Sequence, residues 1–282
     1  MKKLLVIFHI YYHEQIDYFI DKLCNINGID WDLFITYTSE SEETMSKLRK
    51  LKPALRSMKV GNTGYDVWPF IQAIKTINVK QYAYILKLHT KNTNVSRNKL
   101  NGLKLNGNKW RNILVDSILK SPEQFRKCLD TMQDERTGMI CSYELYVALT
   151  EKRKEDLSML SKEADRIGMT IQKGRFCAGT MFMVKTVCLE KIIDADFTQE
   201  MWKCKGSHAG GTLAHVYERI LSIAVEDAGY RVRNLSSSMT NKSIAFTHKH
   251  ISPVLKSIIN LDRYGEEQRK MLTLFGRRFS IE

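Results

Sequence analysis

Short apolar runs alternate with helical segments in the N-terminal third of the chain, and this alternation limits the fold more than any other feature. Residues 3–10 (KLLVIFHI), 31–38 (WDLFITYT) and 82–88 (YAYILKL) are rich in branched and aromatic side chains, as strands buried on both faces are. Residues 14–25 and the stretch around Phe70 carry apolar positions at a helical period. The pattern predicts an α/β fold with a mostly parallel, Rossmann-like sheet flanked by helices.

The rest of the chain continues this pattern with one interruption. Residues 92–108 are rich in asparagine and glycine, which predicts a mobile loop or lid. Ser39 and Glu42 form a candidate capping box for a helix that ends at Leu51. We expect further strands at 56–60, 138–142, 176–184 and 230–234, and further helices at 110–120, 122–134, 150–168 and 212–228.

No linker rich in proline or glycine divides the chain, which holds only 4 prolines in 282 residues. We therefore predict one α/β domain over residues 1–250, followed by a helical C-terminal extension over residues 251–282. The extension is basic and amphipathic in parts. Such a segment is suited to an anionic membrane surface, and a helix packed on the domain is the alternative interpretation.

The charge balance is informative about partners. The chain has 44 Lys and Arg against 31 Asp and Glu, a formal net charge of +13. This excess implies a nucleic acid, a phosphate-bearing substrate or a membrane surface as the partner. The basic residues are dispersed and match no nucleic-acid-binding motif, so we expect no nucleic acid. The six cysteines lack paired spacing, and we interpret them as buried thiols of a cytoplasmic protein, with zinc binding as the alternative.

Residues 62–70 (NTGYDVWPF) form the first segment with a chemical character. Gly64 permits a positive φ or a close backbone approach at a strand-to-helix turn, and the helix that follows offers free N–H groups to an anion. Asp66 is suited to capping that helix or to accepting a ribose hydroxyl. An ordinary capped turn has the same spacing, so this segment alone leaves both interpretations open.

Residues 84–92 (YILKLHTKN) form the second segment. Lys87 lies inside an otherwise buried strand, which is costly unless its ammonium group reaches water or an anion. His89 and Lys91 lie at the carboxyl end of that strand, where open α/β sheets bind ligands. Lys91 is suited to neutralising a diphosphate. A solvated edge, with Lys87 extended to water, is the alternative.

Two later segments add small and polar residues. The run of Ala, Gly and Thr at 178–180 falls inside a predicted strand and leaves room for a bulky ligand, although a bulge or tight helix packing gives the same pattern. The helix predicted over 212–228 carries His215, Glu218 and Arg219 on its polar face. If that face lines a cleft, Glu218 is available as a general base that His215 and Arg219 keep ionised. Most such faces are simply solvated.

Taken together, these segments resemble the rhamnan synthesis protein F family of polysaccharide glycosyltransferases. The family has an Asn-Gly-Asp-Pro-Phe loop, a K-x-H-T-K strand end, an A/G-G-x-M-F strand and a G-T-x-x-H-x-x-E-R helix. All four occur here in order, at 62–70, 87–91, 178–182 and 211–219. The resemblance implies a GT-A-like fold. It also implies transfer of rhamnose, galactofuranose or another hexose from a nucleotide-sugar donor to a bacterial cell-surface polysaccharide or lipid-linked oligosaccharide.

The resemblance has two departures. Many GT-A enzymes carry an Asp-x-Asp metal site after the strand that corresponds to residues 82–88, whereas this chain has His89, Thr90 and Lys91 there. We therefore predict no metal cofactor, with a divalent metal at another carboxylate as the alternative. We expect Lys91, with His89, to supply the positive charge at the leaving diphosphate. Tyr65 and Trp68 replace the Arg and Gly of many family members. This aromatic pair is suited to selecting a different donor or to stacking on the donor base.

The sequence thus predicts a glycosyltransferase. Its single candidate general base favours inversion of the anomeric configuration. We expect the protein to make peripheral contact with the inner face of the membrane. A non-catalytic sugar-binding or scaffold subunit of a polysaccharide-assembly complex is the alternative, and it has no need of an ionised carboxylate in a cleft. The candidate residues are Glu218, Lys91 and His89 for catalysis, Asn62, Gly64, Tyr65, Asp66, Lys87 and Thr90 for donor binding, and Gly179, Thr180, His215 and Arg219 for the acceptor and the cleft.

Overall fold

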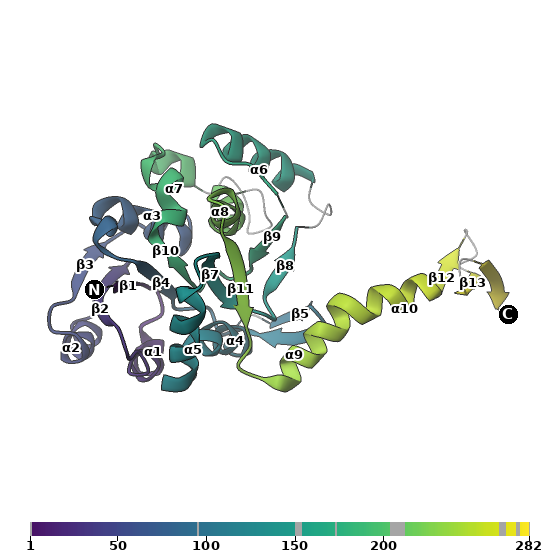
Figure 1. Ribbon diagram of the computed structural model, residues 1–282, viewed down its shortest axis with the longest axis horizontal. Helices are drawn as coiled ribbons and strands as arrows, with labels where there is room; N and C mark the ends of the chain where they lie inside the picture. The colour runs from purple at the N-terminus through teal and green to yellow at the C-terminus, as the bar shows by residue number, and fades with distance from the viewer. Residues whose placement is uncertain are drawn as a thin grey trace.

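The computed structural model has a main body built around one central sheet, and a helix leads from this body to a small sheet near the C-terminus (Figure 1). The predicted α/β class is confirmed. The structure describes residues 2–94, 96–149, 154–172, 174–203, 212–264, 269–274 and 277–281.

The central sheet is mostly parallel, as predicted. Its strand order is β11-β7-β10-β4-β1-β2-β3. β1 pairs in parallel with both β2 and β4, β2 with β3, and β7 with β11, whereas β10 runs antiparallel to its neighbours β4 and β7. The strands are β1 Lys3–Ile10, β2 Asp30–Tyr37, β3 Arg56–Lys59, β4 Tyr84–His89, β7 Thr137–Ser142, β10 Phe182–Lys185 and β11 Arg231–Leu235.

Helices cover both faces of this sheet, which explains the unbroken apolar runs. Every residue of β4 is buried, and so is every residue of β1 after Lys3. In Figure 1, α1, α2, α4 and α5 lie on one side of the sheet, and α3, α7 and α8 lie on the other, with α6 packed against α8. Their bounds are α1 Ile16–Leu23, α2 Glu42–Leu51, α3 Val67–Thr76, α4 Gly107–Leu119, α5 Pro122–Gln133, α6 Lys154–Arg166, α7 Glu190–Asp194 and α8 Leu213–Asp227.

The predicted strand at 176–184 is wrong as a single element. It is divided into β9 (Arg175–Cys177), which pairs with β8 (Tyr146–Ala148), and β10 in the central sheet. The break is conformational, because Gly179 and Thr180 have φ angles of +96° and +49°. A strand cannot continue through two residues in the left-handed region.

Two smaller expectations also need correction. The asparagine-rich stretch 92–108 contains a hairpin, β5 (Ser96–Leu100) and β6 (Leu103–Asn106), and then the start of α4. The N-cap of α2 is Ser41, whose hydroxyl accepts a hydrogen bond from the Thr44 N–H at 3.3 Å. Ser39 is engaged elsewhere, since its hydroxyl and carbonyl oxygens lie 3.0 and 3.1 Å from Nε2 of His13.

The C-terminal part is helical only in its first half. α9 (Met239–Phe246), a π-helical turn (Thr247–Ile251) and α10 (Ser252–Ile258) follow one another without a break, so the predicted boundary at residue 250 lies inside this helix. Three antiparallel strands then form the small sheet: β12 (Ile259–Tyr264), β13 (Arg269–Leu274) and β14 (Arg277–Ile281). Within the described ranges, no helix is long and apolar enough to cross a membrane.

Candidate functional site

The strand order places the switch point of the sheet between the carboxyl ends of β1 and β4. The chain proceeds from β1 to β2 and β3 on one side and then to β4 on the other, so the sheet changes its direction of winding there. Open α/β sheets bind ligands outside the strand ends at such a point. His9 of β1 and His89 of β4 pair in register at this edge. Residues from all four motifs meet beside them.

Lys87, Asp66 and Thr180 form a closed triangle of polar contacts beneath the strand ends. The Lys87 ammonium group, only 1% exposed, donates to the Asp66 carboxylate and, at 2.8 Å, to the hydroxyl of Thr180. The Thr180 hydroxyl in turn donates to the same oxygen of Asp66. The anion that Lys87 requires is therefore supplied by the protein itself, and Asp66 does not cap α3 through its side chain.

This pairing keeps Asp66 ionised. Burial alone raises the pKa of the Asp66 carboxyl, but the charges of His89 and Lys87 and the hydrogen bonds from Lys87 and Thr180 outweigh burial and hold the pKa below its usual range. At pH 7 Lys87 is the cation beside Asp66, because burial lowers the pKa of His89 to about 4 and leaves its ring neutral. The triangle links the first three motifs through one buried ion pair.

His89 lies between two backbone carbonyl groups. Its Nε2 is 2.8 Å from the Gly179 oxygen, and its Nδ1 is 2.9 Å from the Thr90 oxygen. Burial lowers the pKa of His89 to about 4; Lys87 and Lys91 act in the same direction, and Asp66 opposes them. A neutral ring donates through only one nitrogen, so at neutral pH one of the two carbonyls faces an unprotonated nitrogen.

The Gly179 peptide connects the third and fourth motifs. Its N–H donates to Oε1 of Glu218 at 2.7 Å, and its carbonyl faces His89 as described. No other residue type fits here. A Cβ on Gly179 would lie 2.7 Å from both Leu114 Cδ1 and Trp110 Nε1, and the φ of +96° is itself unfavourable for a side chain. Glu218, from α8, is thereby held at the same edge as the end of β4.

Tyr65 and His215 bring the first and fourth motifs together. Their rings meet edge to face, with centroids 5.6 Å apart, and Tyr65 is 42% exposed at a φ of +54°. Nδ1 of His215 lies 2.7 Å from the hydroxyl of Thr212, which also caps α8. Arg219 donates to the carbonyl of His215, and its guanidinium lies 5.0 Å from the ring centre of Phe176. Gly211 of this motif lies outside the described residues.

Lys91 and Thr90 follow β4 directly. The Lys91 ammonium lies 4.5 Å from the centre of the Trp110 ring, a cation–π contact. Its backbone is held by Gln15, which donates to the Lys91 carbonyl at 2.6 Å and accepts from its N–H at 3.2 Å. The Thr90 hydroxyl accepts from the N–H groups of Tyr11 and Tyr12, at 2.9 and 3.0 Å. Thr90 therefore ties the ends of β1 and β4 together.

The 62–70 loop is supported by stacked aromatic rings. Trp68 is 6% exposed and stacks on Trp202, with centroids 4.8 Å apart and ring planes 17° apart. A Cβ on Gly64 would lie 2.5 Å from Cβ of Trp68, so close packing as well as its φ of +68° requires glycine. Tyr65 and Trp68, expected to act as one aromatic pair, therefore lie in different environments. Trp68 is part of the core, Tyr65 alone is exposed at the edge, and Asn62 is exposed at the start of the loop.

Three residues of this site were missed in the sequence. His9 belongs to the predicted buried strand 3–10, yet its Nδ1 lies 3.0 Å from the Thr36 hydroxyl, and burial lowers its pKa to about 4. Gln15 and Trp110 carried no motif signal. His9 was detectable, because a polar residue at the carboxyl end of a strand beside another such strand lies at the ligand-binding edge.

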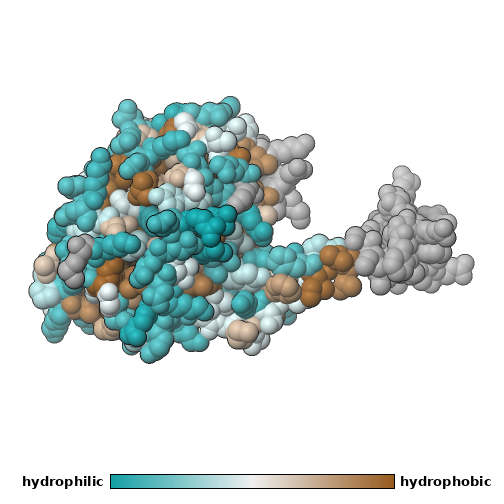
Figure 2. Space-filling model, in the orientation of Figure 1, coloured by the Kyte–Doolittle hydropathy of each residue, from teal (hydrophilic) through white to brown (hydrophobic). Residues whose placement is uncertain are grey.

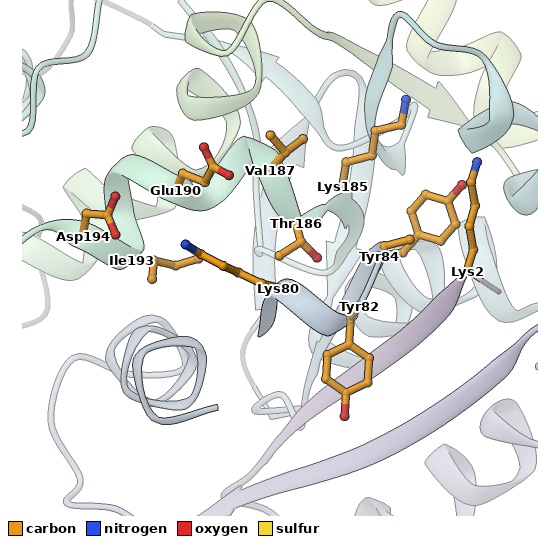
Figure 3. A pocket seen from close by; sticks show the side chains of 11 residues that line it. Lys2, Lys80, Tyr82, Tyr84, Lys185, Thr186, Val187, Glu190, Ile193 and Asp194 are labelled. Atoms are coloured by element: carbon orange, nitrogen blue, oxygen red, sulfur yellow. The ribbon is translucent and has the colours of Figure 1, made fainter. Parts of the chain in front are cut away.

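The described residues contain no group of three or more His, Cys, Asp or Glu side chains suited to a metal ion. A cavity of about 550 Å³ lies at the opposite edge of the sheet, lined by lysines, tyrosines and residues of α7 (Figure 3). Lys2 and Tyr84 mark the amino ends of β1 and β4 there, and Lys185 ends the antiparallel β10. This cavity is therefore separate from the candidate site.

Comparisons with known proteins agree with the motif pattern. The rhamnan synthesis protein F family matches the chain over residues 1–230. Protein WxcX of Xanthomonas campestris pv. campestris is 23% identical over 188 residues, which are 63% of this chain and 25% of that protein, in each of two strains. The chain thus spans about a quarter of the length of the curated relatives that it matches.

Two solved structures also align with most of the chain. The structure of S. aureus TarS 1-349 has 12% identity and a TM-score of 0.46, and covers 84% of this chain and 59% of that one. Mannosyltransferase PcManGT from Pyrobaculum calidifontis, in complex with GDP-Man and Mn²⁺, has 11% identity and a TM-score of 0.44, and covers 83% and 55%.

The family match and the geometry concern the same residues. The matched region, 1–230, includes the loop, the end of β4, the Gly179 turn and the first turns of α8, which meet at one edge of the sheet. The resemblance stated from the four motifs is confirmed: the chain belongs to the rhamnan synthesis protein F family.

Proposed function

We propose that this protein is a GT-A-like glycosyltransferase that moves a sugar from a nucleotide-sugar donor to a growing polysaccharide or lipid-linked oligosaccharide. The observation that carries the proposal is the Gly179 peptide, which joins Glu218 to His89 at the carboxyl edge of the sheet. Glu218 supplies a carboxylate at this edge, and Lys91, two residues after the neutral His89, supplies a cation. Together they match the two needs of glycosyl transfer. One group accepts a proton, and the other stabilises a leaving diphosphate.

The donor diphosphate lies, in this proposal, beside Gly64, Asp66, His89 and Lys91. Lys91 supplies the positive charge that acts on the diphosphate, and its cation–π contact with Trp110 supports it from one side. Asp66 and Lys87 neutralise each other, so their role is to position the turn at Thr180 and the end of β4. Tyr65 is the exposed ring of the loop and the candidate for contact with the donor base or sugar.

Glu218 acts as the general base in a single displacement with inversion. The acceptor hydroxyl oxygen forms a bond to the anomeric carbon while the bond from that carbon to the diphosphate oxygen breaks. Glu218 takes the hydroxyl proton, and the nucleoside diphosphate leaves with the electron pair. Glu218 is half-buried and accepts one hydrogen bond from Gly179, which supports this role by holding the carboxylate in one orientation.

The C-terminal helix supports a peripheral contact with an anionic membrane. α10 projects from the main body, whereas α9 lies beside β6, and apolar side chains are exposed along both helices (Figures 1 and 2). Met239, Phe246, Val254 and Leu255 are between 48% and 76% exposed. The alternative to membrane contact is that the helix packs on the α/β domain. The segment around Lys249 fits this alternative, because Lys249 donates to the carbonyl of Tyr143.

Saturation-transfer NMR against a panel of nucleotide sugars tests the proposal. The panel includes deoxythymidine-diphosphate rhamnose and uridine-diphosphate hexoses, among them the furanose form of galactose. We expect one nucleotide sugar to bind, and the chain to release its nucleoside diphosphate when an acceptor glycan is added. A scaffold subunit would bind sugar without releasing nucleotide. Binding of no nucleotide sugar would overturn the proposal.

A further inference from the structure

A second cavity, of about 410 Å³, lies between α4 and the segment that leads into α9. Its volume is within the range of about 300–1,000 Å³ that is usual for small-molecule sites. In Figure 1 these two elements are neighbours beside the β5–β6 hairpin. Uncharged polar side chains dominate its walls: Asn106, Asn108, Asn112, Ser237, Ser238 and Asn241.

The cavity adjoins the candidate active site along α4. The first residue of α4, Gly107, packs so closely on the backbone after Lys91 that a Cβ there would lie 2.1 Å from the oxygen of Asn92. Trp110, in the next turn, contacts Lys91 and Gly179. Asn106 of the cavity wall and Trp110 are four residues apart, about one helical turn, so the cavity begins near the contact of Trp110 with Lys91.

Hydrogen bonds inside the protein leave amide donors at the cavity. The side-chain oxygen of Asn112 accepts from Nε and Nη2 of Arg111, at 3.1 and 3.0 Å, and the side-chain oxygen of Asn106 accepts from the Lys109 N–H at 2.8 Å. Within the described part of the chain, the NH₂ groups of these two asparagines make no hydrogen bond. They remain as donors for a ligand.

The charged groups of the cavity are mostly engaged. Lys120 donates to the carbonyl of Ser237 at 2.7 Å, and Asp116 forms an ion pair with Lys22 at 2.8 Å. Of the charged side chains that line the cavity, this leaves Lys109, which is exposed. Neutral amides and hydroxyls therefore dominate, and these groups suit a neutral polyhydroxyl ligand better than a phosphate.

We propose that this cavity binds sugar units of the acceptor glycan that lie away from the reacting end. The inference rests on the proposed function, because it requires the neighbouring edge of the sheet, at the ends of β1 and β4, to be the site of transfer. Sugar hydroxyls both donate and accept hydrogen bonds, as amide and serine side chains do. Such a site lowers the KM for long acceptors and leaves short acceptors unaffected.

NMR titration of the full chain with a disaccharide and a hexasaccharide of rhamnose tests the proposal. N112A and N241A, which lie on different elements, should each weaken hexasaccharide binding several-fold and together about tenfold, because each removes hydrogen bonds to the ligand. Disaccharide binding and nucleotide-sugar binding should not change. The matched control is N78A, because Asn78 is exposed and lies outside the cavity, between α3 and β4. Thermal melts verify that each variant is folded.

The two proposals fail in different ways. If the hexasaccharide binds wild type, N112A and N241A equally, or does not bind wild type at all while a nucleotide sugar does, the acceptor cavity is wrong and the transferase proposal stands. If neither donor nor hexasaccharide binds, both are wrong. Weaker hexasaccharide binding by both variants with unchanged disaccharide binding supports the cavity.

Discussion

Glu218 accepts a hydrogen bond from the Gly179 N–H at 2.7 Å, and this contact gives the carboxylate two roles that must be separated. One role is structural, because the contact holds a turn in which Gly179 and Thr180 both have positive φ angles. The other is the proposed role as general base. A glutamine at position 218 keeps an oxygen acceptor for Gly179 and loses the basicity, whereas an alanine loses both.

We therefore predict that E218Q binds the donor normally and keeps its thermal stability but loses transfer by two orders of magnitude or more, roughly the contribution of a general base. E218A should lose transfer and also melt at a lower temperature. Donor titrations, melts and single-turnover assays on both variants check this. A purely structural residue would instead leave E218Q active and E218A inactive.

Lys91→Ala should lower transfer by about two to three orders of magnitude, since it removes the positive charge that acts on the leaving diphosphate. Lys80→Ala removes an exposed lysine at the opposite edge of the sheet and is the matched control. Steady-state assays of both variants check the prediction, and near-normal turnover of Lys91→Ala would refute the role of this lysine.

The same assay addresses metal dependence. With Lys91 in the role of the cation, EDTA should leave activity nearly unchanged. Complete loss of activity with EDTA, restored by manganese, would mean that carboxylates of this chain bind a metal at the donor.

The buried pair of Lys87 and Asp66 predicts a large effect on stability. Lys87→Met leaves the Asp66 carboxylate without its cation, and removing one partner of a buried pair costs about 3–5 kcal/mol. The double variant D66N/K87M should recover much of this loss, because no unpaired charge remains. Urea unfolding measures both free energies. If Lys87→Met lowers the free energy of unfolding by less than about 1 kcal/mol, the pair behaves like a solvent-exposed ion pair, which would contradict the buried arrangement.

Two histidines at the strand ends predict how stability depends on pH. Burial lowers the pKa of both His9 and His89 to about 4, from an ordinary value of 6.5. Between these values the unfolded chain binds more protons than the folded one, so stability should fall as pH decreases from 6.5 to 4. Each histidine contributes a slope of at most ~1.4 kcal/mol per pH unit. H9N should reduce the slope measured by denaturant unfolding, while mutation of the exposed His250 should not.

Much of this architecture was predictable from local pattern. The strands at 3–10 and 82–88 were recognised because helices on both faces make them continuously apolar. The meeting of Lys87 with Asp66 was predictable only in part: a buried lysine requires an anion, but the sequence did not identify which one. In the structure the anion is Asp66, because the 62–70 loop lies against β4.

The remaining misses depend on tertiary contacts. The strand expected at 176–184 breaks because Gly179 is pressed against Trp110 and held by Glu218, and neither contact leaves a local signal. Trp110 itself reads as one more apolar position of a helix. The three strands after Ile258 were expected to be helical, because their alternation is short and mixed with charges.

The membrane contact is tested by truncation after Ser252. The residues removed include the exposed apolar side chains Val254 and Leu255, and six basic residues in the sequence: Lys256, Arg263, Arg269, Lys270, Arg277 and Arg278. Each basic residue near an anionic surface contributes ~1 kcal/mol, so the truncated chain should no longer sediment with vesicles that contain phosphatidylglycerol. Activity on a soluble acceptor analogue should persist, because the candidate site lies within residues 9–219.

A second variant separates the apolar from the electrostatic contribution. Val254→Ser with Leu255→Ser keeps every charge, so it should weaken vesicle binding at all salt concentrations, whereas raising the salt should weaken binding of the wild type by screening its basic residues. Vesicles of phosphatidylcholine alone are the control and should bind little of either protein. If the full-length protein ignores anionic vesicles even at low salt, the C-terminal segment has no membrane role, and its exposed apolar side chains require another explanation.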